Sequence, residues 1–404
     1  MIIAGPDHGR VDGPSGGRST TAIGGVGPVV APPYGRGTLA DLLPSVLARL
    51  GLAGETDVLG LALPRRVAVL LIDGLGADLL AAHADRAPCL TALTNGPGAG
   101  RLAAGFPSTT ATSLTSLGTG LPPGAHGVLG LTMRRPDGGL FSALHWDPAE
   151  VDPIAWQPHE TAFERAAAAG VLVRAVGPRR FRGSGLNSAA FRGAVPRGAE
   201  SPGELAAGTL AALDAGGSDD PVLVYAYHGD LDATGHREGC GSAAWAFQLE
   251  HVDRLVEQIV TGLRPGQALV VTADHGMLDV PAEARVDADE RLELRAGVEL
   301  LAGEPRARYV HAVPGAADDV LAAWREVLGT DWLVCSRDEA VAAGWFGPQV
   351  EESRRAIIGD VVAVPLGPGA VVAATTEPVV SKLIGMHGGL SAGEQFVPLL
   401  CALG

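Results

Sequence analysis

Short apolar runs alternate with segments of helical periodicity along this chain, and this alternation narrows the choice of fold more than any other property. Six runs are rich in β-branched or other apolar residues: Val67–Ile72, Val171–Val176, Val222–Tyr227, Ala268–Thr272, Val361–Val364 and Val371–Thr375. Helical patterns lie at Thr161–Ala169, Pro202–Asp214 and Ser242–Leu263. Strands that alternate with helices predict an α/β fold, with a mostly parallel central sheet covered by helices on both faces.

The 404 residues are enough for one large α/β domain with an insert, or for two domains. Residues 1–35 are rich in Gly, Pro and Ser, which predicts a flexible N-terminal arm. Residues 36–404 are then the main domain. Within it, a stretch at about 278–366 is richer in charge, and we expect it to form a smaller inserted cap region.

Charge and composition restrict the partners. The chain has 45 acidic and 30 basic residues and a formal net charge of -15, which argues against a nucleic-acid polymer as partner. A small anionic substrate stays possible, because a bound divalent metal inverts the local field. The N-terminus has no basic start followed by an apolar stretch, and no run reaches the ~18 apolar residues of a membrane span. We therefore expect a soluble, cytoplasmic protein without a membrane partner, whose four widely spaced cysteines are reduced thiols.

Polar residues follow several of the apolar runs, at the point where each predicted strand ends. They are Asp73, then Asp232 and His236, then Asp274 and His275, and finally His387 in a Gly-flanked loop. Taken alone, each is more often a turn, a cap or a surface residue. In open α/β sheets, however, ligands bind outside the carboxyl ends of the strands. Three carboxylates and three imidazoles suffice for two three-ligand sites, and mixed N/O ligation suits Zn²⁺ or Mn²⁺ better than Ca²⁺.

A nucleophile for such a site is sought near the start of a helix. In Ala104–Gly130, the tripeptide Phe106-Pro107-Ser108 is typical of a chain entering a helix, and Thr109 or Thr110 then lies in the first turn. Free backbone N–H groups and the helix dipole favour an anion there. In the alternative interpretation, Ser108 only caps the helix and both threonines face the core.

Five motifs together resemble the alkaline phosphatase superfamily, and within it the type I phosphodiesterase/nucleotide pyrophosphatase family. They are "LLIDGLG", "FPSTTATSLTSLGTGLPPGAHG", "LDATGH", "TADHGM" and "MHGG". They occur in the family's order and extend from Val67 to about Pro398. The resemblance implies that residues 36–404 form a catalytic domain that binds two divalent metal ions.

The resemblance also implies residue roles. One metal, which also holds the nucleophile, would be bound by Asp73, Asp274 and His275, and the other by Asp232, His236 and His387. The family nucleophile is a threonine ten residues before the glycine of a Thr-Gly pair, which is Thr119-Gly120 here and points to Thr110, with Thr109 as runner-up. An alignment through the "FPN" motif of eukaryotic-like members fails, because Gly105 precedes Phe106. Asn187 is a candidate for binding a phosphate oxygen, and Thr109 is a second candidate for binding the substrate.

The segments "GDLDATGHREG" and "GMHGGLS" are similar to segments of actinobacterial phosphodiesterases that hydrolyse cyclic di-AMP. The resemblance implies a metal-dependent enzyme that converts this small nucleotide to linear pApA and then to AMP, as a monomer or small homo-oligomer. Two alternatives within the superfamily are a nucleotide pyrophosphatase and a phosphomonoesterase, for which Arg182 or Arg192 could bind the dianion. An alternative of another class is a non-catalytic nucleotide-binding receptor.

Overall fold

The computed structural model describes residues 29–404, which form a central sheet with a smaller sheet stacked above it. The central sheet has the strand order β2 (Gly100–Ala103), β17 (Phe396–Leu403), β8 (Gln267–Thr272), β1 (Arg66–Ile72), β7 (Val222–His228), β5 (Leu172–Gly177) and β6 (Val195–Gly198). Only β17 runs antiparallel to its neighbours. The predicted α/β class with a mostly parallel sheet is therefore confirmed.

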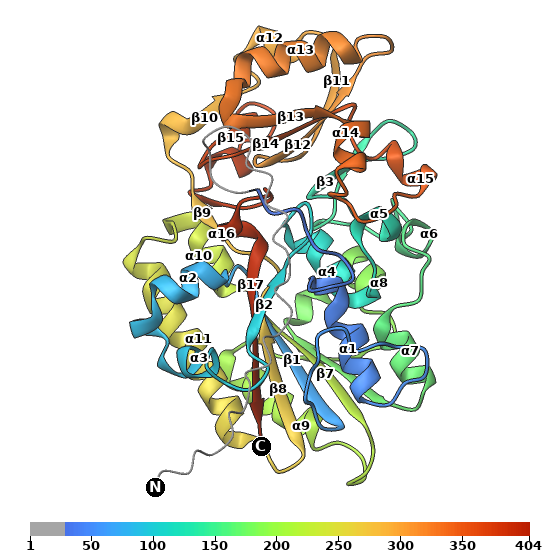
Figure 1. The fold of residues 1–404 in the computed structure, drawn as a ribbon, viewed down its shortest axis with the longest axis vertical. Coiled ribbons are helices and arrows are strands. Elements are labelled where there is room, and N and C mark those ends of the chain that lie inside the picture. The colour runs from blue at the N-terminus through green and yellow to red at the C-terminus, as the bar shows by residue number, and fades with distance from the viewer. Residues whose placement is uncertain (1–28) are drawn as a thin grey trace, which may run out of the picture.

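Helices cover both faces of this sheet (Figure 1). One face carries α2 (Ala77–Ala82), α3 (Pro88–Leu93), α9 (Pro202–Leu213), α10 (Asp230–Glu238) and α11 (Ala243–Gly262). The other carries α1 (Leu42–Arg49), α4 (Thr110–Thr119), α7 (Ala162–Ala168) and α8 (Gly185–Ala190). The predicted helices at 161–169, 202–214 and 242–263 are α7, α9 and α11, and in each the side chain of the residue before the helix caps it.

The middle strands of the sheet are apolar because both of their faces are covered. Strand β1 is buried along all but its first residue, and β8 is buried throughout. Strand β1 pairs in parallel with β7 and with β8, and the register sets Ile72 beside His228 and Leu71 beside Thr272. The residues that follow these three strands therefore emerge together at one edge of the sheet.

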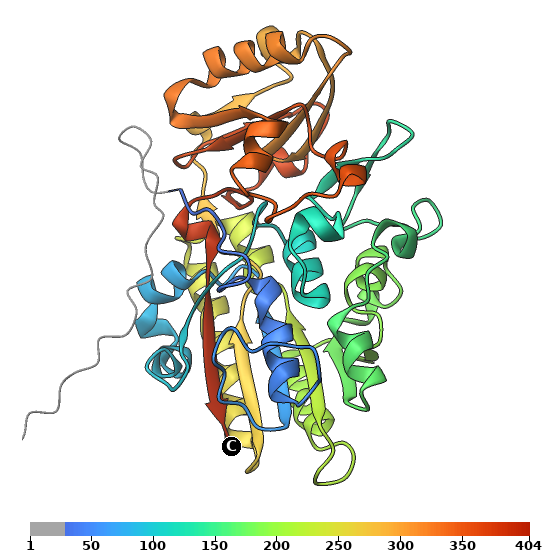
Figure 2. The same cartoon turned by 45° about the vertical axis from the view of Figure 1, so that its right-hand side comes forward.

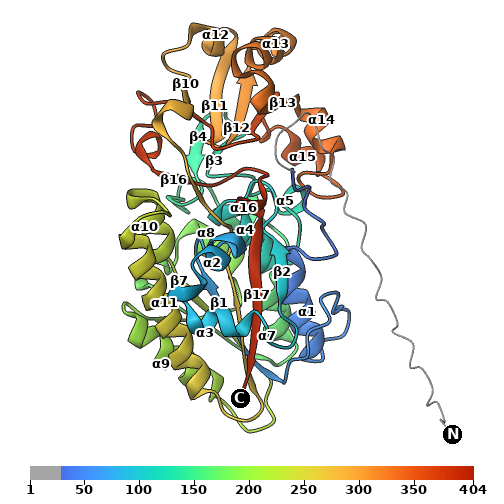
Figure 3. The same ribbon diagram turned by 60° about the vertical axis from the view of Figure 1, so that its left-hand side comes forward.

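The smaller sheet, here called the cap, is antiparallel and lies beyond that edge (Figures 2 and 3). Its order is β13 (Trp332–Ser336), β14 (Val361–Pro365), β12 (Ala307–Ala312), β11 (Val298–Glu304), β3 (Thr132–Arg134) and β4 (Leu140–Ser142). Helix α13 (Ala317–Leu328) packs on it over a separate apolar core. Four of the six strands come from the charge-rich region at 278–366, and the hairpin β3–β4 supplies the other two from far earlier in the chain.

Two of the predicted strands lie outside the central sheet. The run at 361–364 is β14 of the cap. The run at 371–375 was predicted too long, since β15 spans only Ala370–Val372 and pairs with β10 (Arg285–Asp287). Beyond its end, the backbone N–H groups of Thr375 and Thr376 donate to the Asp289 carboxylate at 2.9 and 3.0 Å.

The tip of the β11–β12 hairpin reaches down from the cap into the body. There, the Arg306 guanidinium donates to both carboxylate oxygens of Glu394 at 2.6 and 2.7 Å, and both side chains are fully buried. Glu394 belongs to α16 (Ala392–Gln395), just before β17. A bidentate, buried ion pair therefore joins the cap to the body.

The remaining short elements are α5 (Pro123–His126), α6 (Pro153–Trp156), α12 (Leu292–Arg295), α14 (Arg337–Ala342), α15 (Glu352–Arg355), and the paired strands β9 (Leu278–Asp279) and β16 (Gly385–Met386). Of the predicted arm, residues 1–28 lie outside the described residues. In residues 29–35, Val30 N–H donates to Leu390 O at 2.9 Å and the Tyr34 hydroxyl donates to Trp345 O at 2.8 Å. No helix within 29–404 is long and apolar enough to cross a membrane.

Candidate metal centre and nucleophile

The sheet edge brings all six predicted metal ligands into two adjoining groups. One group is Asp73, Asp274 and His275, and the other is Asp232, His236 and His387. In each group the potential ligand atoms lie within 4.8 Å of one another. Asp73, Asp232 and Asp274 converge because β1, β7 and β8 are neighbours that end at the same edge, and His387 joins them from the loop after β16.

In the first group, Asp73 follows β1, whereas Asp274 and His275 follow β8. His275 Nε2 lies 3.5 Å from Asp73 Oδ1 and 3.4 Å from Asp274 Oδ2. The other oxygen of each carboxylate accepts hydrogen bonds. Asp274 Oδ1 accepts from the backbone N–H groups of Gly74 and His275 at 3.1 Å each, and Asp73 Oδ2 accepts from the Tyr227 hydroxyl. The oxygens near His275 are buried and have no hydrogen-bond partner within residues 29–404.

The second group lies on α10 and on the loop after β16. Asp232 and His236 are four residues apart, which places them on one face of α10, with Asp232 Oδ2 at 3.3 Å from His236 Nε2. His387 Nε2 is 3.9 Å from Asp232 Oδ1. Gly74 has φ +75°, and a Cβ there would lie 3.0 Å from Asp232 Cα, so this glycine lets the two groups approach. The His275 and His387 rings stack at 3.6 Å between centroids and join the groups.

The three histidines share one hydrogen-bonding arrangement. The Nδ1 atoms of His236, His275 and His387 face the backbone carbonyls of Gly385, Gly276 and Ser108 at 2.7, 3.0 and 3.0 Å. Because a carbonyl only accepts, each Nδ1 carries the hydrogen and each Nε2 presents a lone pair to its group. This second contact fixes ring orientation in metal-binding histidines.

The charges in the centre fit divalent cations. Burial, and then the nearby Asp274 and Asp232, raises the pKa of Asp73 well above its usual value. Burial also raises the pKa of Asp232. Burial, with His275 and His236 alongside, lowers the pKa of His387 well below its usual value, which keeps this ring neutral. Neutral imidazoles and close carboxylates with unpartnered oxygens are the donor set that Zn²⁺ or Mn²⁺ requires.

The predicted helix begins beside this centre. Thr110 is the first residue of α4, is 9% exposed, and places its Oγ1 at 3.2 Å from His275 Nε2. Thr109 is the N-cap residue, yet its hydroxyl does not bond the first turn. The unpaired N–H groups of the first turn therefore remain available for an anion held against Thr110.

A first cavity of about 240 Å³ opens on one side of Thr110, and we call it the aromatic cavity. Its lining includes Asn187, which lies on α8, so the structure brings this candidate to the same cavity as Thr110. Aromatic rings form much of the wall, namely Phe181, Phe191, Tyr225 and Tyr227. The Phe191 and Tyr225 rings stack at 4.5 Å, and the buried Tyr225 hydroxyl has no partner among the described residues.

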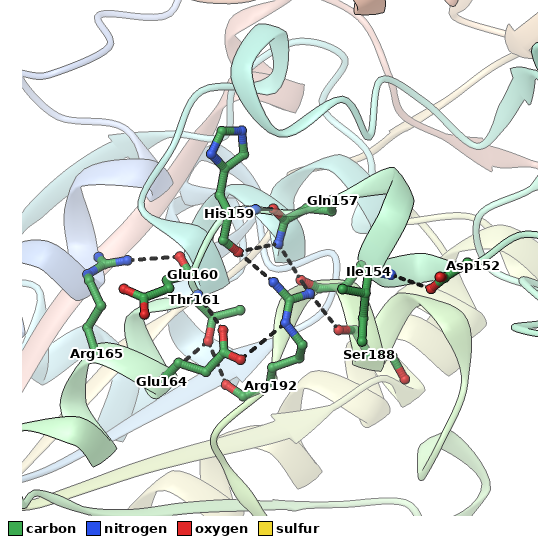
Figure 4. A network of polar contacts seen from close by, with 11 residues as sticks. Asp152, Ile154, Gln157, His159, Glu160, Thr161, Glu164, Arg165, Ser188 and Arg192 are labelled. Atoms are coloured by element: carbon green, nitrogen blue, oxygen red, sulfur yellow. Dashed lines mark hydrogen bonds and ion pairs between the residues drawn. The ribbon is translucent and has the colours of Figure 1, made fainter.

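The two arginines considered for a phosphate dianion differ in position. Arg182 lines the aromatic cavity, together with Arg179 and Arg197, and all three are exposed. Arg192 is engaged elsewhere in a polar network (Figure 4), where it contacts Glu164 Oε1 at 3.3 Å and Ser188 O at 3.0 Å. Arg192 therefore supports the fold around α7 and α8, and it does not line either cavity that contains Thr110.

A second cavity of about 480 Å³ lies on the other side of Thr110, between body and cap, and we call it the cap cavity. It is lined by the second ligand group, by Thr109 and Thr110, and by cap residues that include Glu304. The two cavities share Thr110 and Leu144. The arrangement can accordingly hold a ligand with two arms that meet at Thr110.

Sequence reasoning missed two residues of this site. Tyr227, which holds Asp73, stands near the end of the apolar run that became β7, where a tyrosine among aliphatic residues is the one available signal. The sequence around Glu304 carries no sign of its position, because only the folded β11–β12 hairpin brings it from the cap into the cavity that contains Thr109 and Thr110.

Comparisons with known proteins agree with this geometry. The sequence matches the profile of a family described as type I phosphodiesterase / nucleotide pyrophosphatase over residues 67–390. The fold is similar to murine ectonucleotide pyrophosphatase / phosphodiesterase 5, solved as an inactive threonine-to-alanine variant with AMP, at TM-score 0.66 and 18% identity, covering 83% of this chain and 87% of that one. It is also similar to phosphonoacetate hydrolase from Sinorhizobium meliloti with phosphonoformate, at TM-score 0.65 and 20% identity, covering 84% and 90%. No curated protein sequence matches the chain.

The profile match begins within β1, immediately before Asp73, and ends beyond His387, so it contains all six residues of the two groups and Thr110. It also includes most of the cap. By sequence over most of its length, and in agreement with its fold, this chain belongs to the type I phosphodiesterase / nucleotide pyrophosphatase family of hydrolases, within the alkaline phosphatase superfamily.

Proposed function

We propose that this protein is a phosphodiesterase that cleaves a nucleotide phosphodiester with Thr110 as nucleophile and two divalent metal ions, Mn²⁺ or Zn²⁺, as cofactors. The observation that carries the proposal is the position of Thr110 Oγ1, 3.2 Å from His275 Nε2 at the start of α4 and next to both ligand groups. A hydroxyl is a weak nucleophile unless a metal or a base activates it. Here the hydroxyl stands where a cation held by Asp73, Asp274 and His275 would activate it.

When bound, the two cations would lower the pKa of the Thr110 hydroxyl and neutralise charge on the leaving oxygen. The chain's own residues supply the rest. Thr110 Oγ1 forms a bond to phosphorus as the bond to the leaving oxygen breaks, the electron pair goes to that oxygen, and the hydroxyl proton passes to water. The free N–H groups at the start of α4 bind the phosphoryl oxygens. Water then attacks the nucleotidyl-threonine ester and restores Thr110.

The substrate that we propose is cyclic di-AMP, opened first to linear pApA and then cleaved to AMP. Two cavities that meet at Thr110 suit a diester whose two halves lie on either side of the nucleophile. Stacked aromatic rings in the aromatic cavity suit a nucleobase. Arg179, Arg182 and Arg197 around that cavity suit a second phosphate, in a protein whose net charge of -15 otherwise repels anions.

The test is turnover of cyclic di-AMP by protein stripped of metal and then given Mn²⁺ or Zn²⁺, with products separated by chromatography. We expect pApA followed by AMP, only after metal is restored. Hydrolysis of an aryl phosphodiester without hydrolysis of cyclic di-AMP would retain the enzyme class and remove this substrate. No hydrolysis of either would favour the nucleotide-binding receptor.

Two neighbouring variants test the nucleophile. Thr110→Ala is expected to lower kcat by at least about 10³-fold while the protein keeps both metals, because the side chain that forms the bond is gone. Thr109→Ala is the matched control, one residue away on the same turn, and it should retain most of the activity. Activity that survives in Thr110→Ala and disappears in Thr109→Ala would transfer the role to Thr109.

A further inference from the structure

Glu304 is a buried acid in the cap cavity that the mechanism above does not use. It is the last residue of β11, at the hairpin tip that enters the body, and it is 3% exposed. Its Oε1 has no hydrogen-bond partner among residues 29–404. A buried carboxyl oxygen without a partner is costly, so its position beside a nucleophile calls for a ligand.

The surroundings of Glu304 are shaped to hold it in place. Gly388 has φ +126°, and a Cβ there would lie 2.8 Å from Glu304 Cγ, so the loop after His387 passes directly over this side chain. The Thr109 hydroxyl and the Leu131 backbone N–H face the carboxyl group. Glu304 is thereby fixed between the Thr109–Thr110 turn and the His387 loop, and its side chain forms part of the lining of the cap cavity.

The second ligand group lines the same cavity and identifies which part of the substrate lies there. Asp232, His236 and His387 share the cap cavity with Glu304, whereas Asn187 and the aromatic rings line the other one. In the proposed function, a cation held by Asp73, Asp274 and His275 would activate Thr110, so a cation held by the second group would be the one that neutralises charge on the leaving oxygen. The leaving arm of the diester therefore lies in the cap cavity, beside Glu304.

We propose that Glu304 binds a sugar hydroxyl of the leaving arm through its free carboxyl oxygen, and so determines specificity for a ribonucleotide on that side. The inference rests on the proposed function. Burial raises the pKa of Glu304 to about 8, against smaller opposing effects of Thr109 and Arg308. A hydroxyl both donates and accepts, so it pairs with either the protonated or the ionised carboxyl group.

The experiment compares three substrates that carry the same 5′-adenylyl group. The leaving arms are the ribonucleotide of pApA, the corresponding 2′-deoxyribonucleotide, and 4-nitrophenol. In the wild type we expect kcat/KM to be about tenfold higher for the ribonucleotide arm than for the deoxyribonucleotide arm, since the analogue loses one hydrogen bond to Glu304. In Glu304→Leu this preference should disappear, and kcat/KM should fall more for the ribonucleotide arm than for the 4-nitrophenol arm.

Two further variants separate this role from others. Glu304→Gln keeps an acceptor and a donor and should keep most of the ribonucleotide preference, which a proton-donating role would not allow. Glu299→Leu, on the same strand but paired at the surface with Arg134, should behave as the wild type. Equal losses on all three substrates in Glu304→Leu and Glu304→Gln, or no loss on any, would overturn the inference while leaving the proposed function intact. A wild type that cleaves none of the three substrates would refute both.

Discussion

His126 is fully buried at the end of α5, and both of its ring nitrogens are in use. Val128 N–H donates to Nδ1 at 3.1 Å, so Nδ1 carries the lone pair and Nε2 donates its hydrogen to Ser116 Oγ at 2.9 Å. A second proton on the ring would sit on Nδ1 and would face the Val128 backbone N–H, so that two donors would oppose each other. Burial above all, with smaller effects of His159 and Arg354, lowers the pKa of His126 to about 3.

This shift predicts a loss of stability in acid whose size follows from the two pKa values. An unfolded histidine titrates at about 6.5. Below that pH, His126 binds a proton in the unfolded state but not in the folded state. The contribution of neutral His126 to the free energy of unfolding is therefore complete above about pH 6.5 and is lost as the pH falls toward 3. One pKa unit corresponds to about 1.4 kcal/mol. Acidification from pH 7 to pH 5 should therefore remove about 2 kcal/mol through His126 alone.

The perturbation is His126→Gln, which offers a similar donor and acceptor but does not titrate. We expect the variant to be less stable than the wild type at pH 7 by about 1–2 kcal/mol, because its geometry is less favourable. Its stability should then fall by about 2 kcal/mol less than that of the wild type between pH 7 and pH 5. Urea unfolding of both proteins at the two pH values, without metal, gives this difference directly.

His251→Gln is the control, because this side chain lies exposed on α11 and stays in water when the protein unfolds. It should leave the pH dependence of the wild type unchanged. If the stabilities of wild type and His126→Gln run parallel from pH 7 to pH 5, then His126 is not the buried neutral group described above.

Two further variants test contacts around the site. Glu394→Gln leaves the buried Arg306 guanidinium without its counter-charge, so we expect the free energy of unfolding to fall by about 3–5 kcal/mol. The control is Glu257→Gln, which breaks only the surface pair with Arg254 and should lower the free energy of unfolding by less than about 1 kcal/mol. Equal losses would show that burial does not set the strength of the first pair. Tyr227→Phe removes the hydrogen bond to Asp73 and should weaken metal binding about tenfold in a calorimetric titration. Tyr225→Phe, on the same strand, should bind metal like the wild type; a wild-type affinity in Tyr227→Phe would refute the positioning role.

The part of the fold that local pattern determines was predictable. Strands β1, β7 and β8 are buried on both faces, so their sequences are continuous apolar runs. Such runs can be recognised as buried strands from the sequence alone. Strand β17 was not predicted, although it lies inside the central sheet, because its short apolar run carries no period that separates strand from helix. The membership of β3 and β4 in the cap was likewise hidden, since pairing between residues 132 and 303 is a property of the folded chain.

The residues of the candidate site also fall into those that the sequence could group and those that only the folded structure brings together. Strand ends that share one edge bring Asp73 and Asp274 together, so residue type and position along the chain are sufficient to group them. Asn187 lies by Thr110 because α8 packs against α4, which no local pattern shows. Glu304 depends on the path of a hairpin from another sheet, and its importance arises from burial and a missing partner, which are features of three-dimensional structure.

The Arg306–Glu394 pair also decides how ligands can exchange with the cap cavity. Lifting the cap as a rigid lid would separate two charges that are still surrounded by protein, and breaking such a pair costs about 3–5 kcal/mol. A lid-open state would then be populated at roughly one part in 10² to 10³ or less. The lining of the cap cavity also includes Val379, which is 76% exposed, so the cavity reaches solvent at this segment without any lifting of the cap.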